Sequence, residues 1–215
     1  MGPPPASVAV AEPVTSPPRD ALVRRARALA WLGMAWHGIE AAVAVAAGLA
    51  AGSIALIGFG ADSLVEAMAG FVLLWRFAAS RSASDGAERR AQQLIGIGFY
   101  ALAAYVAVQA VRSLAGGDEP DASTVGIVLA AATLVTMPPL ARAKARLADE
   151  LGSSATKAEG RQNMVCAYLA GALLVGLSAN ALLGWWWADP VTALVIAGVA
   201  VREGRDAWRG LACCA

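Results

Sequence analysis

Long apolar segments, separated by short polar connections, dominate the chain. A helix needs about 20 apolar residues to cross the hydrocarbon core of a bilayer, and six segments approach that length. They span residues 30–51, 54–76, 92–114, 123–141, 160–183 and 185–201. The connections are rich in Gly, Ser, Asp and Pro, which are typical of turns. The pattern predicts an all-α membrane protein, folded as a bundle of six transmembrane helices.

The two ends of the chain differ from this bundle. Residues 1–23 are rich in Pro and Ala and contain no apolar block of signal-peptide length. We therefore predict that they form a disordered N-terminal tail and that the first span acts as an uncleaved insertion signal. The transmembrane domain is expected to occupy residues 24–209, followed by a short C-terminal tail, 210–215.

Basic residues predict the orientation of the bundle. Sixteen of the 17 lysines and arginines lie in the N-terminal segment, the second and fourth connections and the C-terminal segment. With six spans, all of these regions fall on one side of the membrane, and only Arg112 lies at the other. Cytoplasmic loops carry an excess of basic residues, so both termini are predicted to be cytoplasmic. The expected location is the cell (inner) membrane.

Composition supports the membrane assignment and excludes several functions. The chain is 58% hydrophobic and only 15% charged, whereas soluble domains carry about 25% charged residues. A net charge of +1 without a basic, aromatic-rich run gives no indication of nucleic-acid binding. The three cysteines form no CxxC pattern, and no hydrolytic triad or phosphate-binding glycine loop is present, so an enzyme is not expected. Cys213 and Cys214 are expected to belong to a tail without function; the alternative is that they bind metal at the cytoplasmic mouth of the bundle.

Two acids stand out within the second span, in the segment GFGADSLVEAMAGF. Asp62 and Glu66 are four residues apart, which places both on one face of a helix, one turn from each other. Two carboxylates in a medium of low dielectric constant cannot both stay ionised unless a cation or a proton neutralises them. The pair therefore predicts a site that exchanges a metal ion for protons; a structural, hydrogen-bonded pair is the alternative.

The fifth span begins with a second polar face. Glu159, Gln162, Asn163 and Cys166 lie within two turns, and Gln162 and Cys166 are again four residues apart. Amide, carboxylate and thiolate groups can all bind a divalent transition metal, and a thiolate favours zinc. Alternatively, Cys166 is a small apolar residue of the core and Gln162 lies in the cytoplasmic interface.

The first span contains the segment WHGIEAA, in which His37 and Glu40 are three residues apart. His37 is the only histidine of the chain, and could be a metal ligand or a group that accepts protons near neutral pH. Glu40 could exchange protons with the main site. The alternative is a His–Glu pair that only holds helices together.

In these segments the chain resembles the cation diffusion facilitator (cation efflux) family, in a short form that lacks the C-terminal cytoplasmic domain. GFGADSLVEAMAG resembles the second span of that family, GRQNMVCAYLAGALLVG the fifth and WWWADPVTALVIAGVAVREG the sixth. The resemblance covers about residues 24–209. It implies a six-span, proton-coupled exporter of divalent metals that is usually a homodimer.

The resemblance also assigns ligands. The acids of the second span fall on Asp62 and Glu66, and the ligand pair of the fifth span, usually His and Asp, falls on Gln162 and Cys166. A shift by one residue would place the first of that pair on Asn163. We therefore expect an exporter of a divalent cation, most favourably zinc, with these four ligands and with proton-handling or supporting groups at Glu40, His37, Glu159 and Asn163.

Two other functions remain open from the sequence. The first is a proton-coupled exporter of organic cations that uses Glu40 with Trp31 and Trp36 around it. The second is a metal-binding membrane scaffold that does not transport.

Overall fold

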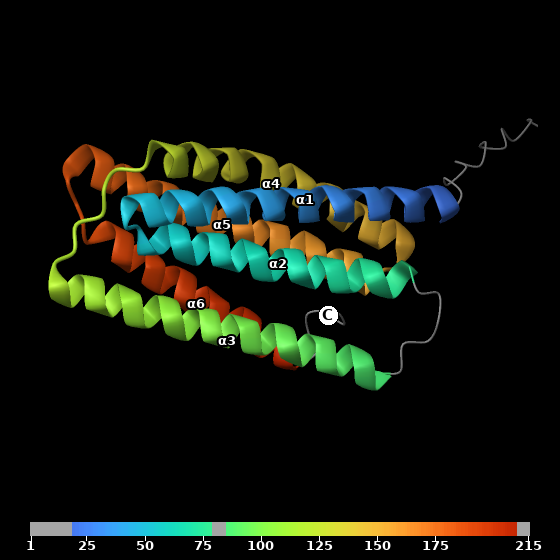
Figure 1. Cartoon of the computed structure of the whole chain (residues 1–215). Helices are drawn as coiled ribbons and strands as arrows, with labels where there is room; N and C mark the ends of the chain where they lie inside the picture. The colour runs from blue at the N-terminus through green and yellow to red at the C-terminus, as the bar shows by residue number, and fades with distance from the viewer. Residues whose placement is uncertain (1–18, 79–84, 210–215) are drawn as a thin grey trace, which may run out of the picture.

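The structure is a computed structural model that describes residues 19–78 and 85–209, and within these residues every regular element is an α-helix. The six helices run back and forth along one common direction (Figure 1). Their bounds are α1 (Arg19–Ala51), α2 (Ile54–Ala78), α3 (Asp85–Gly116), α4 (Thr124–Leu151), α5 (Ser154–Leu183) and α6 (Ala188–Trp208). The predicted bundle of six helices is confirmed.

Several helices are longer than the apolar segments that predicted them. α1 begins at Arg19, so residues 19–23, which we assigned to a disordered tail, are helical. The fourth connection, expected over residues 142–159, shrinks to Gly152 and Ser153 because α4 and α5 continue past their apolar parts. Ala, Arg, Lys, Leu and Glu fill these extensions and are strong helix formers. The remainder of the N-terminal tail and the C-terminal tail, with Cys213 and Cys214, lie outside the described residues.

The turn between α4 and α5 uses residues suited to ending one helix and beginning the next. Gly152 has a φ of 62°, the left-handed conformation that glycine adopts without strain at a helix C-terminus. Ser153 follows as the N-cap of α5, and its side chain accepts a hydrogen bond from the backbone N–H of Thr156. This two-residue turn holds α4 and α5 antiparallel.

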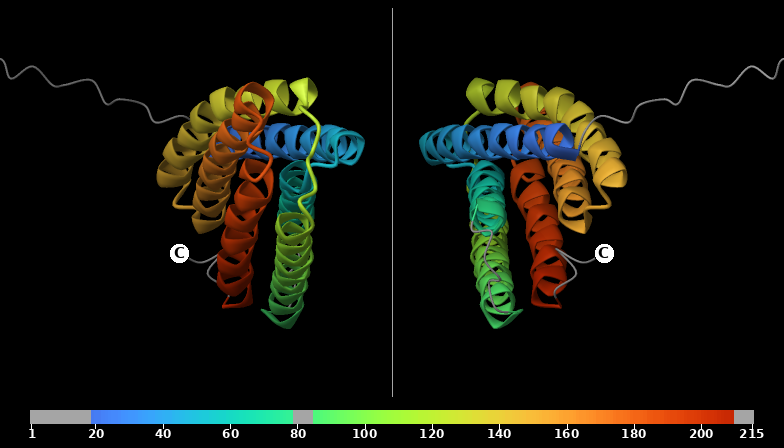
Figure 2. Two further views of the ribbon diagram at one scale, coloured as in Figure 1. Left: turned by 90° about the vertical axis from the view of Figure 1, so that its left-hand side faces the viewer. Right: turned by 90° about the vertical axis from the view of Figure 1, so that its right-hand side faces the viewer.

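The helices pack most extensively in three pairs, α4 with α5, α1 with α2, and α3 with α6. Figure 2 shows the pair α3 and α6 extending away from α1 and α4. α2 lies between α1 and α3 in both views. Glycines permit close backbone contact: a Cβ on Gly96 of α3 would lie 3.0 Å from the carbonyl oxygen of Gly204 on α6. Small residues of this kind promote close helix packing in lipid.

A carboxylate joins the first turn of α2 to the start of α6. Asp189 of α6 accepts hydrogen bonds from the Ser53 hydroxyl and from the backbone N–H groups of Ile54, at 2.9 Å, and Ala55, at 3.3 Å. Ser53 in turn caps α2 by accepting from the N–H of Leu56. Asp189 is 1% exposed. It therefore satisfies N–H groups of α2 that have no partner within their own helix.

α4 contains two consecutive prolines, Pro138 and Pro139, in its interior. A proline has no N–H, so it removes one backbone hydrogen bond of the helix, and its ring also crowds the preceding turn. The carbonyl groups of Leu134 and Val135, four residues earlier, therefore lack their usual partners. The backbone of α4 is weakened at this point.

Among the described residues, four helices are long and apolar enough to cross a membrane: Arg19–Ala51, Gln93–Gly116, Thr124–Leu151 and Thr156–Leu183. Large apolar side chains point outward from the bundle, such as Val135, which is 73% exposed, and Leu182, which is 82% exposed. Such a surface is stable in lipid and costly in water. The protein is an integral membrane protein.

Candidate metal site

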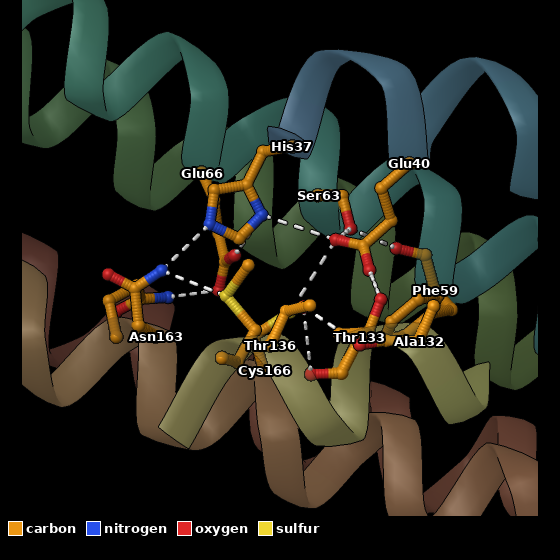
Figure 3. A network of polar contacts seen from close by, with 12 residues as sticks. His37, Glu40, Phe59, Ser63, Glu66, Ala132, Thr133, Thr136, Asn163 and Cys166 are labelled. Atoms are coloured by element: carbon orange, nitrogen blue, oxygen red, sulfur yellow. Dashed lines mark hydrogen bonds and ion pairs between the residues drawn. The ribbon is translucent and has the colours of Figure 1, made fainter. Parts of the chain in front are cut away.

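A buried cluster of polar side chains lies in the interior, where α1, α2, α4 and α5 meet (Figure 3). We call it the polar cluster. It consists of His37 and Glu40 from α1, Ser63 and Glu66 from α2, Thr133 from α4, and Asn163 and Cys166 from α5. Each of these residues is at most 6% exposed. Buried polar groups in a membrane helix are costly and usually serve a function.

Glu40 is held by partners from three other helices. Its carboxylate accepts hydrogen bonds from the hydroxyl of Thr133 on α4 and, at 2.9 Å, from the hydroxyl of Ser63 on α2. The thiol of Cys166 on α5 lies 3.6 Å from its Oε2 atom and donates to it. These contacts determine the position of the carboxylate.

His37 lies between the two carboxylates of the cluster. Its Nδ1 atom is 3.2 Å from Glu40 Oε2 and also 3.2 Å from Glu66 Oε2. Its Nε2 atom is 3.3 Å from the side-chain amide of Asn163. Each edge of the imidazole ring thus has a polar partner.

Glu66 points one oxygen into the cluster. Its Oε1 atom accepts a hydrogen bond of 2.7 Å from the amide of Gln162 on α5. Its Oε2 atom is buried and accepts no hydrogen bond from the described residues, although His37 Nδ1 lies beside it. A carboxylate oxygen in this state is free to bind a cation.

The structure brings three donor atoms of different chemistry close together. Ligand atoms of His37, Glu66 and Cys166 all lie within 4.8 Å of one another. Imidazole nitrogen, carboxylate oxygen and thiolate sulfur are all ligands of Zn²⁺ in proteins. The arrangement can hold a divalent transition metal.

The residues predicted from the sequence do not all meet at this point. Glu66, Cys166, Glu40, His37 and Asn163 belong to the polar cluster, and Gln162 contacts it through Glu66. His37 and Glu40 contact each other, as in the structural alternative for this pair, with 3.2 Å between His37 Nδ1 and Glu40 Oε2. The roles that the sequence predicts for these residues stay predictions.

Asp62 lies one turn before Glu66 and is 2% exposed, so it faces the interior and not the lipid. It makes no hydrogen bond or ion pair with any other residue that the structure describes. It also does not belong to the group of three donors. The carboxylates of Glu203 on α6 and Glu40 on α1 are within electrostatic range of it. Its role as a ligand stays a prediction.

Glu159 lies apart from the polar cluster. It forms an ion pair with Lys144 of α4, with 3.1 Å between Lys144 Nζ and Glu159 Oε2. Lys144 is 4% exposed and its ammonium group packs on Gly33 of α1, where a Cβ atom would be only 2.8 Å away. In the described structure this acid links helices, and the proton-handling role that we expected for it stays a prediction.

Three residues with contacts at or near the site were not predicted from the sequence: Ser63, Thr133 and Lys144. Ser63 and Thr133 lie in apolar spans, where a hydroxyl commonly bonds to a carbonyl of its own helix. Lys144 stands in a basic segment that reads as a cytoplasmic loop. The signal for Ser63 was available, because it lies three residues before Glu66 and therefore on the same side of α2.

Comparison with known proteins identifies the family. A family model described as the cation efflux transmembrane domain matches residues 30–209. A search of curated proteins finds no match. Cation efflux proteins are transporters of metal cations, not enzymes, and they are generally dimeric. The match spans most of the chain and includes the whole polar cluster, so the protein belongs to the cation efflux family of membrane transporters.

Proposed function

We propose that this protein exports zinc from the cytoplasm in exchange for protons. The observation that supports the proposal is the buried oxygen of Glu66, which accepts no hydrogen bond from the described residues and lies in one group with Cys166 and His37. An ionised carboxylate in a bilayer, with one oxygen that accepts no hydrogen bond, is unstable unless a cation or a proton neutralises it. A transported ion and a proton are the two species that can alternate in this position.

The donor atoms support zinc over harder ions. Sulfur and imidazole ligands favour zinc and other borderline metals, whereas magnesium and manganese prefer sites made of oxygen atoms. Glu66 and Cys166 are the ligands that both the sequence and the contacts favour. Asp62 and Gln162 complete the proposed set, with Glu40, Glu159 and Asn163 as supporting groups.

Proton exchange follows from the chemistry of these ligands. Carboxylates and thiols must lose their protons before they bind a metal, so zinc affinity should rise with pH. Such a site releases protons when it binds zinc on one side of the membrane and takes up protons when it releases zinc on the other side. The movement of zinc is thereby coupled to a movement of protons in the opposite direction. Rocking of helices around a central site is the common mechanism of such transporters.

An organic-cation exporter has less support. That function needs an aromatic cavity near Glu40, to which Trp31 and Trp36 would contribute. Trp31 is instead 52% exposed on the outside of the bundle, and Trp36 packs against the apolar core.

The flux of zinc tests the proposal directly. Purified protein in proteoliposomes should move zinc when a pH gradient is imposed, faster than manganese or magnesium, and an agent that collapses the gradient should stop the movement. Liposomes without protein provide the control. Zinc movement that is independent of the gradient would contradict proton coupling, and the absence of zinc movement would contradict the export of zinc.

We further propose that both ends of the chain are cytoplasmic and that the protein lies in the cell (inner) membrane, as the homodimer typical of its family. Asp118 follows α3 at one end of the bundle and Lys157 lies near the start of α5 at the other; both are exposed. In a chain without its natural cysteines, a cysteine introduced by Asp118→Cys should react with an impermeant reagent outside the cell. One introduced by Lys157→Cys should react only after the membrane is permeabilised. The reverse pattern would overturn the orientation.

A further inference from the structure

α1 contributes to the polar cluster a nitrogen donor that can reach the same cation as Glu66 and Cys166. The relevant contact is between His37 Nδ1 and Glu66 Oε2, which are 3.2 Å apart. Two ligand atoms bound at about 2.0 Å to one tetrahedral zinc ion lie about 3.3 Å from each other. The two atoms are therefore already spaced as neighbouring ligands of one ion.

The sulfur of Cys166 completes a set of three. It belongs to the same group, in which all ligand atoms lie within 4.8 Å of one another. Cys166 is fully buried, and His37 and Glu66 are at most 6% exposed. The three donors are therefore shielded from bulk water, which would compete with them for a cation. In this set His37 takes the place of Gln162, whose amide donates a hydrogen bond to Glu66. Three protein ligands leave a fourth position of a tetrahedral ion for another donor, such as Asp62 or water.

Glu40 is placed to orient the imidazole. Its carboxylate is held by Ser63 and Thr133 and lies 3.2 Å from His37 Nδ1. Asn163 lies 3.3 Å from the other ring nitrogen. In the empty site, the contact between Nδ1 and Glu40 holds the ring in place. When Nδ1 binds the cation it gives up that contact, and Nε2 keeps the side chain of Asn163 as its polar partner, as is usual for histidine ligands in metalloproteins.

We propose that His37 is a ligand of the transported cation, so that α1, α2 and α5 together provide nitrogen, oxygen and sulfur donors, and that Glu40 positions the ring. The inference rests on the proposed function, since it concerns the same site. It adds that α1 contributes directly to selectivity, because loss of the nitrogen donor leaves a site in which oxygen ligands dominate and the preference for zinc over manganese decreases.

The sequence makes a direct test possible, because His37 is the only histidine of the chain. X-ray absorption at the zinc edge detects the characteristic scattering of a coordinated imidazole. In protein purified without a histidine tag, such a signal can come only from His37. We expect it in the wild type and not in His37→Gln or His37→Ala, each of which should bind zinc at least about tenfold more weakly.

Only variants that elute from a gel-filtration column as a single folded species are compared. Two substitutions are made at position 37, so that a folding defect in one of them does not decide the outcome. Glu40→Gln should retain the imidazole signal while zinc affinity falls about tenfold, and Glu150→Gln, the same change at an exposed acid, should change neither. A wild-type protein that binds zinc without an imidazole signal would overturn the inference and leave the proposed function intact. A wild-type protein that binds no zinc would overturn the proposed function itself. Zinc affinity at the wild-type level in Glu40→Gln would overturn the positioning role, and complete loss of zinc binding in that variant would make Glu40 a ligand.

Discussion

Replacing Glu66 with glutamine is expected to weaken zinc binding by at least about 100-fold, equivalent to about 2.7 kcal/mol of binding free energy. The substitution keeps the shape of the side chain but removes the negative charge that faces His37 and Cys166. A neutral amide oxygen is a much poorer ligand for a divalent ion than a carboxylate. Isothermal titration of the purified protein with zinc at two pH values measures the loss.

The same titration includes two comparisons. Glu150→Gln removes an exposed carboxylate at the end of α4 and should bind zinc as the wild type does. Asp62→Asn tests the ligand role that the sequence predicts for Asp62, and it should weaken binding in the same direction. Wild-type affinity in Glu66→Gln at both pH values would refute the metal site, because this carboxylate is common to the sequence prediction and the observed cluster.

Replacing Asp189 with alanine is expected to lower the free energy of unfolding by at least about 3 kcal/mol. The change leaves the hydroxyl of Ser53 and the N–H groups of Ile54 and Ala55 without their acceptor. Each buried donor without a partner costs about 1–3 kcal/mol, and α2 also loses a negative charge at the positive end of its dipole. The midpoint of thermal unfolding in detergent should fall accordingly.

Asp118→Ala serves as the matched control, because it removes an exposed acid at the same end of the bundle and should leave the midpoint unchanged. Asp189→Asn should fall between the wild type and Asp189→Ala, because its amide oxygen can still accept one or two of the three hydrogen bonds. If Asp189→Ala unfolded at the wild-type temperature, water would have to replace the carboxylate, and the link between α2 and α6 would have no stabilising role.

The fold could be predicted because the bilayer imposes a length and a composition on each helix. Four of the six apolar segments lie within observed helices, and the other two begin one residue before α4 and three residues before α6. The glycines and serines between the segments mark most of the turns. The helix ends on the basic side were harder to predict. Residues such as Arg146 and Glu150 are polar enough for a loop but have high helix propensity, and hydropathy does not report the second property.

Only those features of the candidate site that depend on residue spacing within a single helix could be predicted. The spacing of four residues between Asp62 and Glu66 identifies the face of α2 that holds Glu66. The spacing of three residues between His37 and Glu40 shows that these two side chains can meet on α1. The sequence cannot show which faces of different helices meet. Hence the contact of Glu40 with Thr133, 93 residues away, and the separation of Asp62 from the group of three donors could come only from the structure.

The consecutive prolines of α4 separate two anchoring points on that helix. On one side of them, Thr133 ties α4 to Glu40 of α1; on the other, Lys144 ties α4 to Glu159 of α5. The backbone between these anchors already lacks two hydrogen bonds, so bending there breaks fewer of them than elsewhere in the helix. The two halves of α4 can therefore bend relative to each other: one is tied to Glu40 of α1, and the other to Glu159 near the start of α5 and to Gly33 of α1. This gives the bundle a built-in hinge that the other five helices do not contain within their described residues.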